Sequence, residues 1–255
     1  YAKQHLKAVG VGFVDATQTE VGFLCRLVAA AQKALADRAI IYDTAGITTP
    51  EKYAALVSSI RAETSLPLHV HCHNDFGLAT ANTVAGILAG ADGADVVVNG
   101  LGDRGGNAPL EEVVLALERL YNFSTKIKLD KIAGLSNLVE EKIGIRKCLV
   151  KPVVGAYTFL HSPVQHIRNA AEGNYQGFEP FAPETIGAQR KYAFTLPVDY
   201  APALEPFFAK LKIKPENIDG IIRELRKNSL KGGLTEPQVL EIIAETNKKS
   251  NKVQV

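Results

Sequence analysis

The stretch Leu-His-Val-His-Cys-His-Asn-Asp, residues 68–75, gives the clearest indication of how this chain folds. Apolar residues alternate with histidines, and the stretch ends in polar residues. Because side chains alternate between the two faces of a strand, we expect His71 and His73 to point the same way. His69 would lie on the same face one step deeper, and we interpret it as a core residue or a residue behind a site rather than as a ligand.

Short apolar runs rich in β-branched residues also occur at residues 11–15, 39–43 and 95–99. Each run, like residues 68–73, is followed by a segment with helical spacing. The strands recur about every 30 residues, which is the spacing of a βα unit, and such units build parallel sheets. We therefore expect an α/β fold with a parallel sheet, either open or closed into a barrel.

Polar residues stand where the predicted strands end. Ligands bind at the C-terminal ends of the strands in both open parallel sheets and closed barrels. Buried parallel strands otherwise read as continuous apolar runs, so ionisable groups collected at one rim indicate a functional site. The residues at this rim are Asp15, Asp43-Thr44, His73-Asn74-Asp75 and Asn99-Gly100.

His71 and His73 have the spacing of a metal site. Two imidazoles side by side at the end of a strand form half of a divalent-metal site, which a carboxylate, an amide or water completes. The alternative is a pair of core histidines satisfied by hydrogen bonds. The rim position and the adjacent Asn74-Asp75 favour the metal.

A glycine-rich loop, Asn-Gly-Leu-Gly-Asp-Arg-Gly-Gly-Asn at residues 99–107, follows the next strand. Glycine permits positive φ and close backbone approach, which predicts a shaped loop. The loop leads into a helix at Pro109, and helix N-termini attract anions. Such a turn can also be purely structural. Arg104 either pairs with Asp103 to shape the loop or contacts a substrate.

The composition excludes several functional classes. The chain has 255 residues, 46% hydrophobic and 22% charged, and a net charge of +2 is too small to indicate a nucleic-acid surface. No apolar run reaches the roughly 20 residues of a membrane span. The three cysteines lack metal-type spacing, which indicates free thiols in a reducing cytoplasm. The chain has no methionine and begins in what looks like a helix, so we expect a fragment, a processed product or one piece of a split protein.

Three motifs in order resemble one enzyme family. They are Asp43-Thr44-Ala45-Gly46, the stretch His71-Cys72-His73-Asn74-Asp75-Phe76-Gly77-Leu78-Ala79, and the loop at residues 99–107. Over residues 11–120 the chain resembles the metal-dependent acyl-CoA condensing enzymes of the 2-isopropylmalate synthase and homocitrate synthase family. The wider superfamily includes hydroxymethylglutaryl-CoA lyase and pyruvate carboxyltransferases.

The resemblance implies a (β/α)8 TIM barrel, of which this chain holds the C-terminal half, about the last four βα units. A small α-rich linker or communication subdomain follows it. The implied division is residues 1–124 for the barrel part, 125–200 for the linker subdomain and 201–255 for a small helical subdomain. The rhythm of strands and helices does break near Thr125, and two or three small helices are expected beyond Pro197.

The resemblance also implies the chemistry, a Claisen-type condensation of acetyl-CoA with a 2-oxo acid assisted by a divalent metal such as Zn, Mg or Mn. Asp15 would contact the acyl acceptor, or would simply cap the following helix. The implied metal ligands are His71, His73 and Asn107, and the implied substrate-binding residues are Thr44, Arg104 and Asn74.

A weaker resemblance covers the linker subdomain, through Pro152–Gly155, Phe159-x-His161 and Pro183-Glu184-x-x-Gly187. In the family this subdomain reaches into the barrel of the partner protomer and contributes a histidine and often a tyrosine. His166 matches that histidine, with an acid or base role, since the pKa of a histidine lies near neutrality. Tyr192 or Tyr157 would be the tyrosine. The alternative is a set of surface histidines in a linker.

Two departures from the family's sequence pattern bear on which function this chain has. Nothing here matches the Asp-x-Thr-x-Arg motif of the family's first strand, and Val14-Asp15-Ala16 stands where the family often has Glu-Asp-Ala. We therefore expect a homodimer or a complex with a chain that carries the first barrel half. The short segment after Ile213 favours the short homocitrate synthase type. The alternatives are a carbon–carbon lyase or aldolase of the same superfamily, and a non-catalytic half-barrel subunit of a split synthase.

Overall fold

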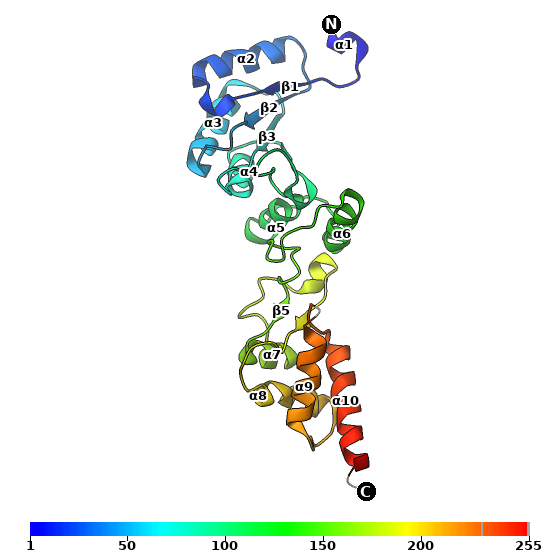
Figure 1. Cartoon of the computed structure of the whole chain (residues 1–255). Helices are drawn as coiled ribbons and strands as arrows, with labels where there is room; N and C mark the ends of the chain where they lie inside the picture. The colour runs from blue at the N-terminus through cyan, green and yellow to red at the C-terminus, as the bar shows by residue number, and fades with distance from the viewer. Residues whose placement is uncertain (231, 254–255) are drawn as a thin grey trace. The chain divides into compact units, whose positions relative to one another are not determined.

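The computed structural model describes residues 1–230 and 232–253 (Figure 1). The chain divides into two compact units, Tyr1–Ile127 and Lys128–Val255. Lys231, Gln254 and Val255, which belong to the predicted 201–255 subdomain, lie outside the described residues.

The first unit is built on a four-stranded parallel sheet in the order β1-β2-β3-β4. The expected α/β fold with a parallel sheet is thus confirmed, whereas closure into a barrel stays a prediction. The strands are β1 (Gly10–Phe13), β2 (Arg38–Asp43), β3 (Leu68–Cys72) and β4 (Gly93–Asp95).

The expected strand at residues 95–99 is the main error in the strand assignment. β4 ends at Asp95, where the prediction had a strand begin, and a short 3-10 turn, η2 (Val98–Gly100), follows. Asn99 adopts φ 62°, a left-handed conformation that a strand does not accommodate. Val97 makes only an isolated bridge to Pro109, so the chain leaves the sheet before the glycine-rich loop begins.

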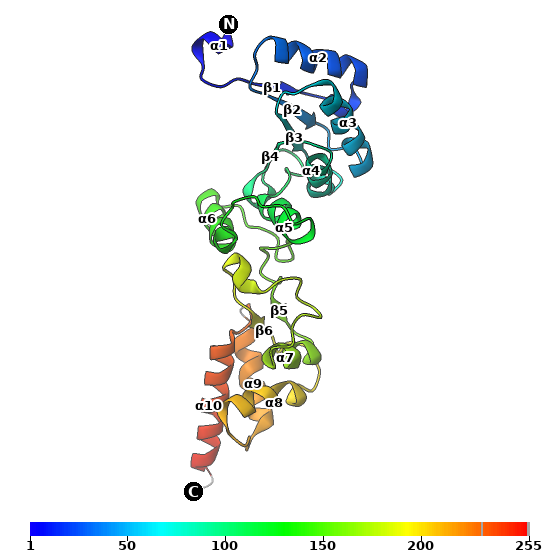
Figure 2. The same ribbon diagram turned by 180° about the vertical axis from the view of Figure 1, so that it is seen from behind.

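Helices follow the strands as the βα rhythm predicted (Figures 1 and 2). Thr49 caps α3 by accepting a hydrogen bond from the Lys52 N–H, and Pro50 occupies the first turn. The helical elements of this unit are α1 (Ala2–His5), η1 (Ala16–Gln18), α2 (Val21–Lys33), α3 (Pro50–Glu63), α4 (Ala79–Leu88) and α5 (Leu110–Leu120).

The two faces of β3 have different environments. Leu68, Val70 and Cys72 are fully buried in a core shared with the helices, while His69 and His71 point to the other face and are half-buried. The period-2 alternation in the sequence therefore gives the strand one apolar face and one face of imidazoles.

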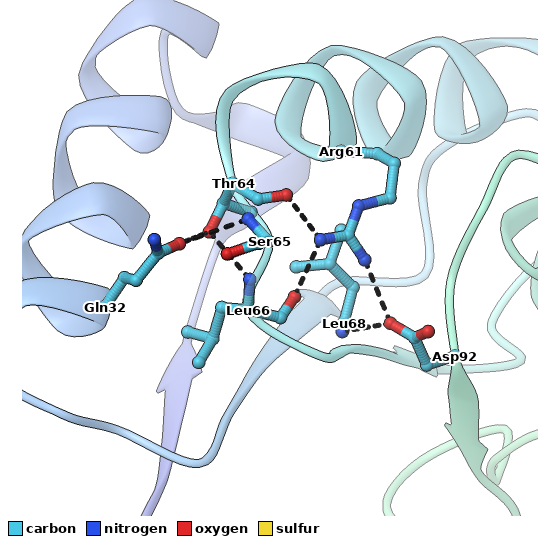
Figure 3. Close-up of polar contacts among 7 residues, drawn as sticks. All are labelled: Gln32, Arg61, Thr64, Ser65, Leu66, Leu68 and Asp92. Atoms are coloured by element: carbon cyan, nitrogen blue, oxygen red, sulfur yellow. Dashed lines mark hydrogen bonds and ion pairs between the residues drawn. The ribbon is translucent and has the colours of Figure 1, made fainter.

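A hydrogen-bond network fastens the strands at the end opposite to the predicted site (Figure 3). Arg61, near the end of α3, donates to the carbonyl oxygens of Thr64 and Leu66 and forms an ion pair with Asp92 at 2.9 Å. Asp92 also accepts the N–H of Leu68 at 2.8 Å. One side chain thus connects α3, the start of β3 and the turn before β4.

The second unit has its own aromatic core. Tyr192, Phe194, Tyr200 and Phe207 are each at most 1% exposed and pack against apolar residues of the surrounding helices. Its elements are η3 (Leu129–Lys131), α6 (Ile132–Ile143), β5 (Leu160–His161), α7 (Val164–Ala171), η4 (Pro183–Ile186), β6 (Lys191–Tyr192), α8 (Ala201–Leu211), α9 (Ile218–Ser229) and α10 (Glu236–Val253).

The three helices α8, α9 and α10 agree with the two or three small helices expected beyond Pro197. The division of this unit at residue 200 into a linker and a helical subdomain stays a prediction. Within the described ranges, no helix combines the length and the apolar character that crossing a membrane requires.

Candidate functional site

His71 and His73 lie side by side at the C-terminal end of β3, with ring centroids 5.1 Å apart. Both side chains are half-buried. His73 follows the last strand residue, and its Nδ1 lies 3.2 Å from the main-chain oxygen of Asp43. Because a carbonyl oxygen only accepts, that contact places a proton on Nδ1 of His73.

The glycine-rich loop returns to the two histidines through Asn107. This residue is 6% exposed, makes a bridge to His73, and its Nδ2 donates to Nε2 of His71 at 2.8 Å. A Cβ at Gly102 would overlap Oδ1 of Asn107, so glycine is needed there for the amide to reach its position. The loop is therefore shaped as predicted, and it brings the three predicted metal ligands together.

The donors agree in kind with a divalent-metal site. Two neutral imidazoles and an amide oxygen suit a borderline cation, and catalytic sites keep further positions for water or substrate. Among residues 1–230 and 232–253, no group of three or more His, Cys, Asp or Glu side chains is arranged to hold a metal. Asn107 turns its amide nitrogen rather than its oxygen to Nε2 of His71, and the assignment of His71, His73 and Asn107 as ligands stays a prediction.

Asp95 and Tyr42 were not identified from the sequence. The Asp95 carboxylate lies 3.3 Å from Nδ1 of His71 and 3.7 Å from Nδ1 of His69, and the Tyr42 ring lies 4.5 Å from the His71 ring. The parallel register pairs His71 with both residues, Tyr42 on β2 and Asp95 on β4. A strand register assigned from the sequence would have paired both residues with His71. The predicted strand began at Asp95, so Asp95 was not paired with His71.

Thr44 and Asp15 meet at the rim of the sheet. Asp15 has φ 58°, and its N–H donates to Oγ1 of Thr44 at 2.7 Å. The Thr44 oxygen therefore acts as an acceptor there, and its O–H remains able to donate to a substrate carboxylate. The Asp15 side chain is exposed and accepts from Nε2 of Gln18 at 3.1 Å.

Arg104 pairs with Asp75, not with Asp103 as one reading of the sequence held. Its Nε and Nη2 donate to the two carboxylate oxygens of Asp75 at 2.7 and 3.0 Å, and Nη2 also donates to the main-chain oxygen of Thr44 at 2.7 Å. The hydrogen bonds from Arg104 lower the pKa of the Asp75 carboxyl. Oδ1 of Asn74 accepts the Ala79 N–H at 3.0 Å, at the start of α4.

The predicted residues of the linker lie in the second unit. His166 is half-buried and stacks on Phe178, with 4.4 Å between centroids and 5° between planes. Tyr192 is 1% exposed, and burial raises its pKa to about 12. Tyr157, the other tyrosine considered, is 49% exposed.

A buried charged cluster, which the sequence did not single out, lies next to His166. Glu179 accepts two hydrogen bonds from Arg190, both at 2.6 Å, and one from Nε2 of His161 at 2.7 Å. Burial alone would raise the Glu179 pKa, but these hydrogen bonds outweigh it and lower the pKa. Burial lowers the pKa of His161, so its ring is neutral and donates to an ionised Glu179.

Known proteins resemble this chain in sequence and in structure. The family model described as HMGL-like matches residues 1–139. A putative (R)-citramalate synthase of Archaeoglobus fulgidus is 38% identical over 248 residues, which cover 96% of this chain and 50% of that protein. A 2-isopropylmalate synthase of Sulfurisphaera tokodaii is 43% identical over 194 residues, covering 76% and 50%. The structure of a Bacillus subtilis HMG-CoA lyase matches with a TM-score of 0.46 and 26% identity, covering 49% of this chain and 44% of that one.

The chain spans about half the length of these curated relatives. The family match covers more than half of this chain and includes the strand of His71 and His73 and the loop of Asn107. The chain belongs to the HMGL-like family and, within it, to the 2-isopropylmalate and homocitrate synthase group.

Proposed function

We propose that this chain carries the metal-binding half of the active site of an acyl-CoA condensing enzyme. The reaction joins acetyl-CoA to a 2-oxo acid and gives a homocitrate-type or isopropylmalate-type hydroxy acid. The observation that carries this proposal is the convergence of His71, His73 and Asn107 at the end of β3. The names of the relatives add citramalate to the candidate products.

His71, His73 and Asn107 would hold the divalent metal. When bound, the metal would polarise the ketone of the oxo acid as a Lewis acid. Thr44 donates its O–H to the substrate carboxylate, and Asn74 and Arg104 line the same rim. Asp15, exposed beside Thr44, contacts the acyl acceptor.

The proton of the acetyl methyl group needs a base, and we assign it to His166, supplied to the barrel of a partner protomer. A half-buried imidazole suits proton transfer near neutral pH. Tyr192 is the assisting tyrosine in this proposal. Because its side chain is buried, it would act through neighbouring groups of the second unit. The enzyme would work in the cytoplasm as a homodimer or with a second chain.

An assay of thiol release tests the reaction. The 255-residue chain, alone and combined with a chain that carries an Asp-x-Thr-x-Arg strand, is incubated with acetyl-CoA, zinc or manganese, and a panel of 2-oxo acids. We expect free CoA only from the combination and only with a matching oxo acid. A lyase or aldolase releases no free CoA under these conditions, so cleavage of a hydroxy acid supplied in a parallel incubation, without thiol release, would support that alternative.

A second candidate is a non-catalytic half-barrel subunit. Within the described sheet, β1 and β4 each pair with a single neighbouring strand, as in half of a barrel. Native mass spectrometry of the purified assembly separates the candidates. Co-purification of a second polypeptide with the missing motif supports a split enzyme, whereas a folded chain found alone and inactive with every oxo acid supports a scaffold.

A further inference from the structure

Asp95 and His71 face each other across β4 and β3. The two residues are partners in the parallel register, and Oδ2 of Asp95 lies 3.3 Å from Nδ1 of His71. The other carboxylate oxygen lies 3.7 Å from Nδ1 of His69, a buried atom that makes no hydrogen bond within the described residues. The Asp95 carboxylate therefore lies beside His69 and His71, and His71 is the ring it contacts most closely.

The contact with Asp95 determines which nitrogen of His71 carries the proton. An ionised carboxylate only accepts, so the His71 ring must present its N–H at Nδ1. A neutral imidazole protonated at Nδ1 has its lone pair on Nε2. That nitrogen receives Nδ2 of Asn107 at 2.8 Å, and an amide N–H is a donor. The partners at the two ends of the ring thus require the same tautomer.

A packing contact holds the plane of the same ring. Tyr42 lies against His71 with 4.5 Å between ring centroids and 31° between planes. A Cβ at Gly12 would stand 2.9 Å from Cε2 of Tyr42, so the missing side chain of Gly12 leaves the space that the tyrosine ring occupies. His71 is therefore restrained at Nδ1 by Asp95 and across its plane by Tyr42.

We infer that Asp95 is a positioning residue that keeps the His71 proton on Nδ1 and so leaves Nε2 as the acceptor nitrogen of the ring, whose lone pair a divalent cation would take in exchange for the Asn107 N–H. His73 is held in a parallel way, because its Nδ1 lies 3.2 Å from the main-chain oxygen of Asp43. The partner of His71 is thus a side-chain carboxylate, which a substitution can remove, whereas the partner of His73 is a main-chain carbonyl. The identity of the cation rests on the proposed function, but the tautomer exists without it.

The test reads the tautomer and the metal separately. The metal-free 255-residue chain is labelled with 15N at histidine, and long-range 1H–15N spectra report the protonated nitrogen of each ring; His71→Asn assigns the signal. We expect the Nδ1–H form in the parent and a shift toward the Nε2–H form in Asp95→Ala. Zinc affinity, measured by competition with a chromophoric chelator, falls about 10- to 100-fold in Asp95→Ala. Asp95→Asn keeps an acceptor oxygen and restores most of the Nδ1–H form.

Asp92→Ala is the matched control. Asp92 stands just before β4 and is held by Arg61 and the Leu68 N–H, so its loss lowers stability without touching His71. A parent-like tautomer and zinc affinity in Asp95→Ala would overturn the inference. It also fails if Asp95→Asn behaves as Asp95→Ala, or if Asp92→Ala shifts the tautomer equally. A predicted tautomer shift in a chain that binds no zinc would support the positioning role of Asp95 and reject the proposed metal.

Discussion

Arg104 and Asp75, which are 29 residues apart in the chain, form a two-pronged ion pair with N–O distances of 2.7 and 3.0 Å. Arg104 has φ 52°, and its Nη2 also donates to the main-chain oxygen of Thr44. A Cβ at Gly46 would collide with the Asp75 carboxylate, so the loop after β2 fits closely around this pair. The loops after β2, β3 and β4 are thus joined by one guanidinium group.

We predict that Arg104→Ala speeds amide hydrogen exchange in residues 44–48 and 101–107. The free energy of unfolding changes little, because exposed ion pairs contribute little to stability. Arg104→Lys keeps the charge but loses the fork, and it gives an intermediate exchange rate. The structural role would be contradicted if Arg104→Ala exchanged at the parental rate and the assembled enzyme showed a raised KM for the oxo acid. The guanidinium group would then bind the substrate.

His71→Ala and His73→Ala are each predicted to abolish stoichiometric metal binding, because each removes one of two imidazole donors. His69→Ala, the matched control on the same face of β3, retains most of the metal. Atomic emission spectroscopy of the purified variants measures the metal content. Equal metal content in all three variants would refute the assignment of His71 and His73 as ligands.

His166→Ala is predicted to lower turnover in the assembled enzyme about 100-fold or more, the size of a lost acid or base. Metal content remains that of the parent, because His166 is not among the proposed ligands. Gln165→Ala, at an exposed neighbouring position on α7, is the control and retains activity. Parental turnover in His166→Ala would remove this histidine from the mechanism.

Glu179 is predicted to make the second unit sensitive to acid. Its pKa in the folded chain lies below the ordinary value of 4.5, so the unfolded chain takes up a proton first as the pH falls. The stabilisation is complete above pH 4.5 and is lost as the pH falls through the lowered pKa. Glu179→Gln leaves the Arg190 charge without its carboxylate partner and lowers the free energy of unfolding by about 3 kcal/mol at neutral pH.

Urea denaturation at a series of pH values measures this effect. In Glu179→Gln we expect a lower stability at pH 7 and a flatter dependence on the acid side. Glu141→Gln, at an exposed residue of α6 that pairs with its neighbour Lys142, is the control. A stability profile parallel to that of the parent down to the acid transition would contradict the role of Glu179.

Arg61→Ala is predicted to destabilise the first unit by about 1–3 kcal/mol, because it leaves the carbonyl oxygens of Thr64 and Leu66 without their donor. The network in Figure 3 lies at the N-terminal ends of the strands, so the tautomer of His71 stays unchanged. Chemical denaturation followed by far-UV circular dichroism measures the loss. Arg26→Ala, an exposed position on α2, should leave the unfolding midpoint unchanged.

Local sequence patterns predicted the parallel sheet and the convergence of His71 and His73. A period of two places His71 and His73 on one face whatever the partner strands are, and the βα rhythm requires parallel pairing. The prediction failed where the chain left regular structure. Asn99 sits in a left-handed turn rather than a strand, because the loop must turn back to carry Asn107 to His73.

The sequence by itself therefore determined three of the four strands, the row of imidazoles and the glycines that allow a tight loop, since each depends on neighbours a few residues away. Only the tertiary structure decided that Asp95 contacts His71 and that Arg104 pairs with Asp75 rather than with the adjacent Asp103. It also decided that Glu179 lies between His161 and Arg190. These pairings join residues that are 11 to 29 positions apart. Such contacts depend on strand register and loop closure, which no local pattern specifies.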